Sequence, residues 1–315
     1  MNTLLIGLAA FILDWLLGDP PRWPHPVRWM GCLISWLETR LRRHAMQGFA
    51  RYVAGGLLWI VVVGISGVGC WWLLEQLESI HPMLRVIIEI WLGFTTLAGK
   101  CLKQSAYAVL IPLKSGDIAH ARQMLSYIVG RDTSKLDHQQ ITRATVETVA
   151  ENTIDGVIAP MLFLFLGGVP WAVAYKAVNT LDSMVGYKNE RFREMGFVSA
   201  KMDDIANFLP ARIGWLMLAL SAVVLRLDAR AALKVGWRDR YNHKSPNSAW
   251  SEAAVAGALG VKLGGPSQYF GEWVDKPWIG DKRRDIEIHD IALACRLMLV
   301  SSILSVGFCS LWILI

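Results

Sequence analysis

The chain has 315 residues, of which 54% are hydrophobic and only 18% are charged. Soluble domains usually contain about 45–50% apolar and about 25% charged residues, so this composition indicates a polytopic membrane protein. It excludes disordered, collagen-like and disulfide-scaffold chains. The formal net charge of +6 is expected to lie in cytoplasmic loops, and no nucleic-acid partner is predicted.

Apolar runs in the first third of the chain predict three membrane helices. Residues 53–74 carry no charge, and about 20 apolar residues suffice to cross the hydrocarbon core. Residues 4–17 and 83–97 are shorter runs that contain charged side chains. The first of these lacks a basic segment before it, so we expect a retained helix and not a cleaved signal peptide.

A tight hairpin is predicted near the middle of the chain. Residues 157–175 are uncharged, but Gly167-Gly168-Val169-Pro170 interrupts them, and Gly-Gly followed by Pro is a turn signal. The run therefore predicts two helices, over 145–166 and 170–186, whose outer ends lie on the same side of the membrane. Two further apolar runs predict spans at 208–225 and 297–315.

The predicted fold is an all-α polytopic membrane protein with a helical hairpin around residues 145–186. The polar stretches are too short for separate domains, so residues 1–315 are expected to form a single membrane-embedded domain. Lys and Arg clusters place 18–52 and 100–150 in the cytoplasm. Counting the predicted spans then places residues 229–290 on the opposite side of the membrane from the cytoplasm, although this loop carries ten Lys and Arg residues. The number of spans and the side of that loop therefore stay open.

The most informative polar stretch is residues 143–156, which contains three carboxylates at helical spacing. Glu147, Glu151 and Asp155 follow each other at i, i+4 and i+8, so an α-helix places them on one face over about 12 Å. Like charges at this spacing repel and require a cation, protons or basic partners. A solvated helix surface is the alternative. A carboxylate at the end of a membrane helix costs free energy, however, and is normally found there only where it has a function. We predict a functional site here, to which Asn152 adds a neutral oxygen.

A second polar cluster is predicted on the returning helix of the hairpin. Lys176 and Asn179 share one helical face, and Asp182 adjoins them. Because the hairpin is antiparallel, this cluster should return to the end that holds Glu147 and Glu151. The alternative is a helix end that is merely anchored by polar residues.

Several other polar residues have both a functional and a structural interpretation. Asp203 and Asp204 suit a metal, but Asp in a first helical turn also satisfies backbone donors and the helix dipole. His25 lies in a Pro-rich turn, where a histidine is usually structural. Arg131 follows Gly130 in a turn that suits a phosphate or carboxylate, with a plain helix-ending glycine as the alternative. The P-loop motif is absent, so any ATP chemistry must use another kind of nucleotide site.

Five motifs occur in the order typical of one family. Through them the chain resembles the adenosylcobinamide-phosphate synthases, which are integral membrane proteins of cobalamin biosynthesis, and the resemblance runs from the first predicted helix to about residue 271. The motifs are Asp14…Gly18-Asp19-Pro20…His25-Pro26-Val27, Val129-Gly130-Arg131-Asp132-Thr133, Val146-Glu147…Glu151-Asn152…Asp155-Gly156, Tyr175-Lys176…Asn179…Asp182-Ser183…Gly186-Tyr187 and Ser245-Pro246-Asn247.

The resemblance implies a ligase that joins adenosylcobyric acid to aminopropanol phosphate, or to aminopropanol, with ATP as co-substrate and Mg²⁺ as cofactor. It implies a multi-pass protein in the bacterial cytoplasmic (inner) membrane, in contact with the lipid bilayer. A homo-oligomer, or a complex with other cobalamin-assembly membrane enzymes, is compatible with it. Two other classes stay open: a sensory membrane protein like the relative that acts in β-lactamase induction, and a secondary transporter with acidic residues in broken helices.

We assign roles to the candidate residues by combining their chemistry with this resemblance. Mg²⁺ usually takes one or two protein carboxylates together with substrate phosphates, and activation of a carboxylate as an acyl phosphate depends on neutralising phosphoryl charge. The catalytic candidates are Glu147, Glu151, Asp155 and Asp182. The metal candidates are Glu147, Glu151, Asp203 and Asp204. The substrate- or phosphate-binding candidates are Arg131, Arg143, Lys176, Asn152, Asn179, His25 and Asn247.

Overall fold

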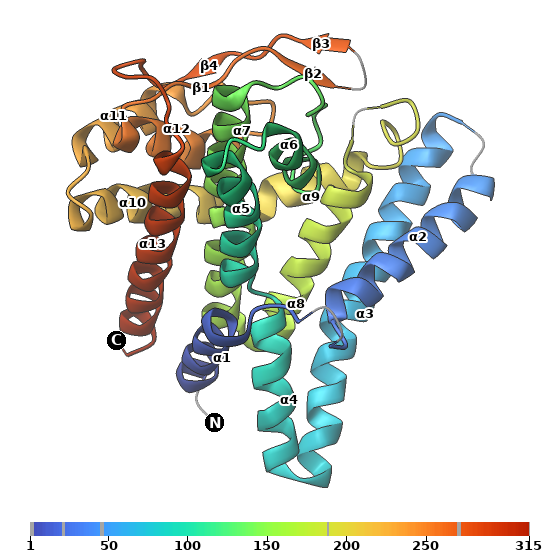
Figure 1. Ribbon diagram of the computed structural model, residues 1–315. Coiled ribbons are helices and arrows are strands. Elements are labelled where there is room, and N and C mark those ends of the chain that lie inside the picture. The colour runs from blue at the N-terminus through green and yellow to red at the C-terminus, as the bar shows by residue number, and fades with distance from the viewer. Residues whose placement is uncertain (1–2, 21–22, 45–46, 188, 270–271, 315) are drawn as a thin grey trace. The chain divides into compact units, whose positions relative to one another are not determined.

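The computed structural model describes residues 3–20, 23–44, 47–187, 189–269 and 272–314, and it is mostly helical (Figure 1). This confirms the predicted class of helical polytopic membrane protein. The helices of the first half are α1 (Thr3–Leu17), α2 (Pro26–His44), α3 (Phe49–Ile80), α4 (Pro82–Thr95), α5 (Gly99–Lys114), α6 (Ile118–Ser126) and α7 (His138–Thr153). Those of the second half are α8 (Ala159–Val185), α9 (Phe197–Ala206), α10 (Phe208–Val224), α11 (Ala229–Asp239), α12 (Ser248–Leu259) and α13 (His289–Leu314).

Two features depart from an all-α fold of regular helices. A π-helical turn, η1 (Ile154–Ile158), joins α7 to α8. Two antiparallel strand pairs follow α12 and were not predicted: β1 (Leu263–Gly264) pairs with β4 (Trp278–Ile279), and β2 (Ser267–Tyr269) pairs with β3 (Glu272–Val274).

Four segments of the described chain are long and apolar enough to cross a membrane, or five if α9 and α10 together count as one span. Helix α1 is not among them, because its 15 residues extend only about 22 Å and the hydrocarbon core is about 30 Å thick. The last residue of the predicted C-terminal span, 315, lies outside the described residues. The four segments are Phe49–Ile80, Pro82–Lys114, His138–Val185 and His289–Leu314.

The helices group into two compact units, each assembled from segments that are distant in the sequence. Both units contain helices from the candidate spans, so a single membrane-embedded domain stays a prediction. Unit 1 comprises Met1–Ala98, Ala159–Asn207 and Cys309–Ile315, and unit 2 comprises Gly99–Ile158 and Phe208–Phe308.

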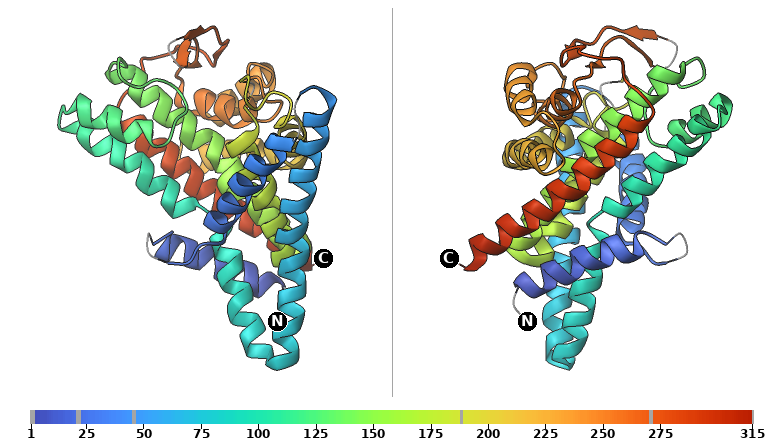
Figure 2. Two further views of the ribbon diagram at one scale, coloured as in Figure 1. Left: turned by 90° about the vertical axis from the view of Figure 1, so that its right-hand side faces the viewer. Right: turned by 60° about the vertical axis from the view of Figure 1, so that its left-hand side comes forward.

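The core of unit 1 forms around α3 and α8. Helix α3 packs against α2, α4, α8 and α9, and α1 packs against α4 and α8. Figure 2 shows α3 and α4 running side by side in opposite directions. The buried apolar side chains of this core include Leu58, Val62 and Leu74 of α3 and Leu164, Ala177 and Leu181 of α8.

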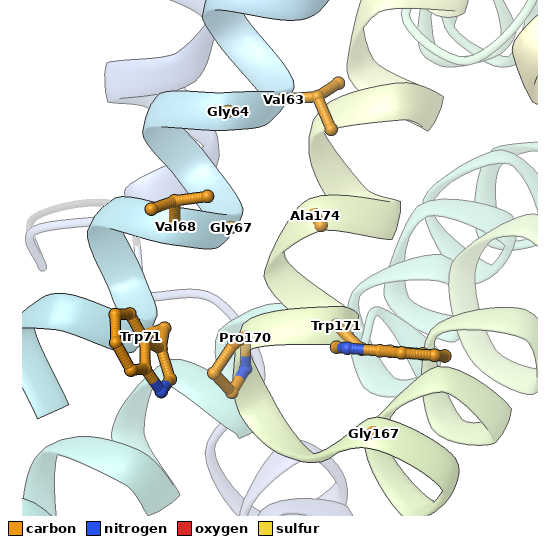
Figure 3. Close-up of a pocket in the computed structure, with 9 residues that line it drawn as sticks. All are labelled: Val63, Gly64, Gly67, Val68, Trp71, Gly167, Pro170, Trp171 and Ala174. Atoms are coloured by element: carbon orange, nitrogen blue, oxygen red, sulfur yellow. The ribbon is translucent and has the colours of Figure 1, made fainter. Parts of the chain in front are cut away.

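Helix α8 is broken at Gly168. This residue has φ 71° and ψ −172°, a conformation that side chains other than glycine essentially do not adopt. Figure 3 shows the ribbon turning between Gly167 and Pro170, beside a cavity of about 410 Å³ that lies between α3 and α8. The predicted position of the hairpin turn is confirmed, and a straight helix through 157–175 is excluded.

Replacing Gly168 by alanine should destabilise the protein by about 1–3 kcal/mol, because the backbone must keep a positive φ. An added Cβ would meet only Pro170 Cδ at 3.8 Å, so the effect is conformational and not steric. Thermal unfolding of purified protein measures it. Gly69→Ala is the matched control: it lies within α3 with open space around it, and Ala there should be neutral or stabilising. A Gly168→Ala protein that unfolds no earlier than wild type would contradict this prediction.

Helix α2 lies within the stretch predicted to be a cytoplasmic loop, and it contributes a buried charge to unit 1. The sequence suggests that Glu38 is an ordinary surface acid, and this expectation is wrong. Glu38 is only 3% exposed and forms ion pairs with Arg42 at 3.0 Å and with Arg191 at 3.1 Å. A carboxylate buried to this extent requires such partners.

Unit 2 is built around α12. Every residue from 249 to 259 is buried, and the helix packs against α7, α10 and α11 and against strands β1 and β4. A helix that is apolar on all sides is normally buried, and the small Ala and Gly side chains of α12 let its neighbours approach closely. Figure 1 shows α7 and α12 beneath the β1–β4 pair. This arrangement brings the polar residues of α7 and α12 together.

Candidate functional site

Helix α7 carries the acidic residues predicted from the sequence, and its start is fixed by a capping box. The Asp137 side chain accepts from Gln140 N and the Gln140 side chain accepts from Asp137 N, both at 2.8 Å. Glu147 and Glu151 lie one turn apart on this helix. The α-helix ends at Thr153 and η1 begins at residue 154, so Asp155 lies in the π turn and not in α7 itself. That all three carboxylates share one face therefore stays a prediction.

Both carboxylate oxygens of Glu147 are occupied. Arg131 Nη2 donates to Oε2 and pairs with it as an ion pair, and Gly264 N donates to Oε1 at 2.7 Å. Arg131 Nη1 also donates to Ser267 Oγ at 3.4 Å. Glu147 is 4% exposed, so this buried carboxylate ties α7 to the Arg131 turn and to the first strand pair.

Gly264, which donates to Glu147, lies at a position that has no room for a side chain. Its φ is 70°, and a Cβ at this position would lie 2.7 Å from the Pro277 carbonyl oxygen. Only glycine fits both the left-handed backbone and this close approach. The Gly264-Gly265-Pro266 sequence thus shapes one wall of the site.

Glu151 faces α12. Its Oε1 accepts from Ser248 Oγ at 2.9 Å, at the first residue of α12. Glu151 is half-buried, and no ion pair to it occurs among the described residues. It therefore differs from Glu147 in keeping an oxygen that is available to a ligand.

Glu252 lies in the buried α12 and was not singled out by the sequence. It is 5% exposed, and no hydrogen bond to its side chain occurs within the described part of the chain. Burial raises the pKa of Glu252 well above its usual range, and the charges of Glu151 and Glu147 raise it further, while Lys276 and Arg131 oppose the shift. The surroundings of Glu252 thus favour its neutral form.

His243 completes the cluster, in the loop between α11 and α12. Burial lowers the pKa of His243, and Lys276 adds to this effect, whereas the charges of Glu151 and Glu147 oppose it. The ring Nδ1 accepts from Ser245 N at 3.1 Å. A neutral ring with an accepting Nδ1 carries its proton on Nε2, so His243 offers an N–H donor.

Replacing Glu252 by glutamine should change how stability depends on pH. The raised pKa means that wild-type stability is fully present below the ordinary Glu pKa of about 4.3 and is lost as the pH rises through the folded-state value. The two proteins should therefore unfold at similar temperatures at pH 5, and Glu252→Gln should become the more stable one as the pH rises. Unfolding temperatures between pH 5 and pH 9 measure this.

The difference between the two curves isolates the effect of Glu252. His243 has a lowered pKa, so its contribution is lost as the pH falls below about 6.5, and this contribution is present in both proteins. A wild-type protein and a Glu252→Gln protein with parallel curves over the whole range from pH 5 to pH 9 would contradict the raised pKa.

The remaining predicted residues of unit 2 have separate positions. Asn152 Nδ2 donates to Thr148 O of its own helix at 2.9 Å. Asn247 is 5% exposed, and its Oδ1 accepts from Arg212 Nη1 at 3.0 Å. Arg143 lies in a separate cavity beside Trp278. Arg131 and Asn247 thus support the site through protein partners.

Three predicted residues of unit 1 take part in local networks. His25 Nε2 lies 3.0 Å from Asp19 Oδ1. Asp203 Oδ2 accepts from Asn207 Nδ2 at 3.0 Å, and Asn207 Oδ1 accepts from the Tyr175 hydroxyl at 2.8 Å. Asp204 pairs with Lys201 at 3.3 Å. The structural interpretation suffices for these contacts, and a ligand role stays a prediction.

Lys176, Asn179 and Asp182 also belong to unit 1, where all three lie half-buried on α8. Glu147 and Glu151 belong to unit 2. The predicted meeting of the two clusters therefore stays a prediction.

The described residues contain no group of three or more His, Cys, Asp or Glu side chains that could by themselves hold a metal ion. Mg²⁺ bound with a nucleotide needs only one or two protein carboxylates. Of the predicted metal candidates in unit 2, Glu151 fits such a role better than Glu147, because both oxygens of Glu147 already accept from protein donors. A metal role for either residue stays a prediction.

The sequence-based prediction missed His243, Glu252 and Lys276. Glu252 carried a signal: it is the single charged residue of an Ala- and Gly-rich helix, and a lone carboxylate in an apolar helix is costly unless it is neutral or used. His243 and Lys276 lie in polar loops, and their sequence context does not distinguish them from solvated residues.

The fold and the site define a polytopic helical membrane protein with a buried acid–base cluster on α7 and α12. Residues 7–298 match the family described as "CobD/Cbib protein". The chain therefore belongs to the CobD/CbiB family.

Two curated relatives cover nearly the whole chain. The "Cobalamin biosynthesis protein CobD" of Klebsiella pneumoniae is 58% identical over 305 residues, which cover 97% of this chain and 96% of the relative. The "Cobalamin biosynthesis protein CbiB" of Salmonella typhimurium is 56% identical over 305 residues with the same coverage. No solved structure gives a significant match.

Proposed function

We propose that this chain acts in cobalamin biosynthesis as an acid–amine ligase of the bacterial cytoplasmic membrane. It joins adenosylcobyric acid to aminopropanol phosphate, or to aminopropanol, at the expense of ATP, and the phosphorylated amine gives adenosylcobinamide phosphate. Membership of the CobD/CbiB family supports the pathway, and the names of the two relatives give cobalamin biosynthesis as their role. The candidate membrane spans support the location.

The observation that carries the proposal is the buried acid–base cluster of unit 2. It combines Glu151, which keeps a free oxygen, with Glu252, whose pKa is raised by burial, and with His243, which is neutral and carries its proton on Nε2. A ligase that handles phosphates and carboxylates needs few negative charges and several donors at its centre. The raised pKa of Glu252 favours its neutral form and serves the first need, and His243 and Arg131 serve the second.

The first step activates the carboxylate of the corrinoid, since a carboxylate is a poor electrophile. A carboxylate oxygen bonds to the γ-phosphorus of ATP, the bond between that phosphorus and the bridging oxygen breaks, and ADP leaves with the electron pair. Such phosphoryl transfer depends on positioning and on neutralising charge. Glu151 would hold the Mg²⁺ that accompanies ATP, and that ion supplies the charge neutralisation when bound.

The second step forms the amide. The amine nitrogen bonds to the carbonyl carbon of the acyl phosphate, the bond from that carbon to the phosphate oxygen breaks, and the amine proton passes to the departing phosphate. Negative charge develops on the carbonyl oxygen during this attack. His243 Nε2–H is suited to donate to that oxygen, because Ser245 N fixes the ring through Nδ1.

Product analysis tests the proposal directly. Purified protein in lipid nanodiscs is mixed with adenosylcobyric acid, Mg-ATP and either aminopropanol phosphate or aminopropanol, and the products are identified by mass spectrometry. We expect a corrinoid amide to form together with ADP and phosphate, and ATP turnover to require the corrinoid.

Two results would contradict the ligase. A protein that binds corrinoid without turning over ATP would fit a sensory role, and ion or solute flux in liposomes without amide formation would fit a transporter. The reaction with the two amines also decides which of them is the substrate.

A further inference from the structure

A second cavity in unit 2 lies outside the acid–base cluster. It has a volume of about 250 Å³ and is formed by α7, the residues around β1 and β4 and the loop before α13. This volume is below the range typical of drug-sized ligands, so the cavity suits a small group and not a whole corrinoid. Its lining residues are Gln139, Arg143, Lys262, Trp278, Lys282, Arg284, Asp285 and Ile286.

The lining of this cavity is strongly basic, with four cationic side chains and one carboxylate. Two of the cations have acidic partners: Lys282 pairs with Asp285 at 2.7 Å, and Arg284 donates to both oxygens of Asp290. Arg143 and Lys262 have no carboxylate partner among the described residues. A bound anion could therefore balance these two positive charges.

Both of these cations contact the Trp278 ring. Arg143 Cζ lies 4.9 Å and Lys262 Nζ lies 4.6 Å from the centre of that ring, and all three residues line the cavity. Cation–π contacts of this kind contribute about 0.5–2 kcal/mol each, but two positive charges beside one ring repel each other. An anion bound in the cavity would offset this repulsion.

Arg143 also has an unused donor inside the protein. Its Nε is buried and has no hydrogen-bond partner within the described part of the chain. A buried donor without a partner costs about 1–3 kcal/mol, and more when the group is charged. The described part of the protein therefore leaves hydrogen-bonding capacity of this guanidinium unused.

We propose that this cavity is a binding site for a phosphate group, held by Arg143 and Lys262 against Trp278. Arg143 donates from its planar guanidinium, Lys262 contributes a point charge, and Gln139 adds an amide at the rim. The group can come from a soluble phosphorylated molecule or from the headgroup of an anionic lipid. The site does not depend on the proposed ligation.

Phosphate binding is tested by thermal unfolding in nanodiscs of zwitterionic lipid. Sodium phosphate is titrated at constant ionic strength with sodium chloride as the reference salt. A ligand that binds only the folded protein raises the unfolding temperature in a saturable way. We expect this for the wild type, and we expect Arg143→Gln and Lys262→Gln each to weaken phosphate binding at least tenfold. Arg230→Gln, which removes an exposed charge on α11, should bind phosphate as the wild type does.

A second arm distinguishes the two sources of the phosphate group. If the site takes a lipid headgroup, adding phosphatidylglycerol to the nanodiscs raises the unfolding temperature of the wild type and abolishes its response to sodium phosphate. In Arg143→Gln the same lipid changes neither the unfolding temperature nor the response to sodium phosphate. If it takes a soluble phosphate, the lipid leaves the response to sodium phosphate unchanged.

The proposal is overturned if neither probe stabilises the wild type. It is equally overturned if Arg143→Gln and Lys262→Gln both respond as the wild type does. Neither readout involves corrinoid or amide formation. The phosphate site and the ligase activity are therefore tested independently, and either proposal can be contradicted while the other is supported.

Discussion

Glu151→Gln is expected to lower the rate of ligation about 10²–10³-fold while the protein still inserts and folds. Glutamine is nearly isosteric and can still accept from Ser248 Oγ, so the contact between α7 and α12 survives. The change removes the negative charge that would hold Mg²⁺ with the nucleotide. Loss of about 3–4 kcal/mol of transition-state stabilisation corresponds to this factor. Turnover measured across a Mg²⁺ titration tests it.

A matched control for this variant is Glu190→Gln. Glu190 is exposed, and no ion pair to it occurs within the described residues, so its neutralisation should leave turnover nearly unchanged. Near-normal turnover of Glu151→Gln at every Mg²⁺ concentration would return the acidic pair to a merely structural role. The catalytic assignment would then move to Asp182, Asp203 and Asp204.

Glu147→Gln is expected to lower both activity and stability, which distinguishes it from Glu151→Gln. Glu147 is buried against Arg131, whose side chain is only 15% exposed. Removing one partner of a buried ion pair leaves an uncompensated charge and typically costs about 3–5 kcal/mol. We expect a loss near the lower end, about 3 kcal/mol, because Arg131 keeps some contact with solvent. Thermal or denaturant unfolding of the purified protein measures it.

A double variant separates the effect of losing the Arg131–Glu147 contact from the effect of leaving Arg131 without this carboxylate. In Arg131→Met with Glu147→Gln no unpaired charge remains, so most of the lost stability should return while ligation stays impaired. If the two substitutions instead destabilise additively, Arg131 and Glu147 are not energetically coupled, and the structural role given to Glu147 is wrong.

The sequence by itself determined the class of fold and the position of several elements. Uncharged apolar runs identify α3 and α13 because about 20 apolar residues cross a bilayer. The break at Gly168 follows from the Gly-Gly-Val-Pro sequence, since that turn depends on local backbone freedom. The spacing of Glu147 and Glu151 on α7 is equally local.

Only the tertiary structure decided which partners and which surroundings each carboxylate has. Glu147 receives its partners from Arg131 and from Gly264, 117 positions further on, and Glu151 meets Ser248 across 97 positions. Glu252 acquires its raised pKa because α12 is buried beside α7, and burial depends on packing between distant segments. The π turn that contains Asp155 was likewise not predicted from the helical spacing of the sequence. Local spacing therefore identified the acidic pair, and long-range packing determined which member forms an ion pair, which keeps a free oxygen and which additional acid has a raised pKa.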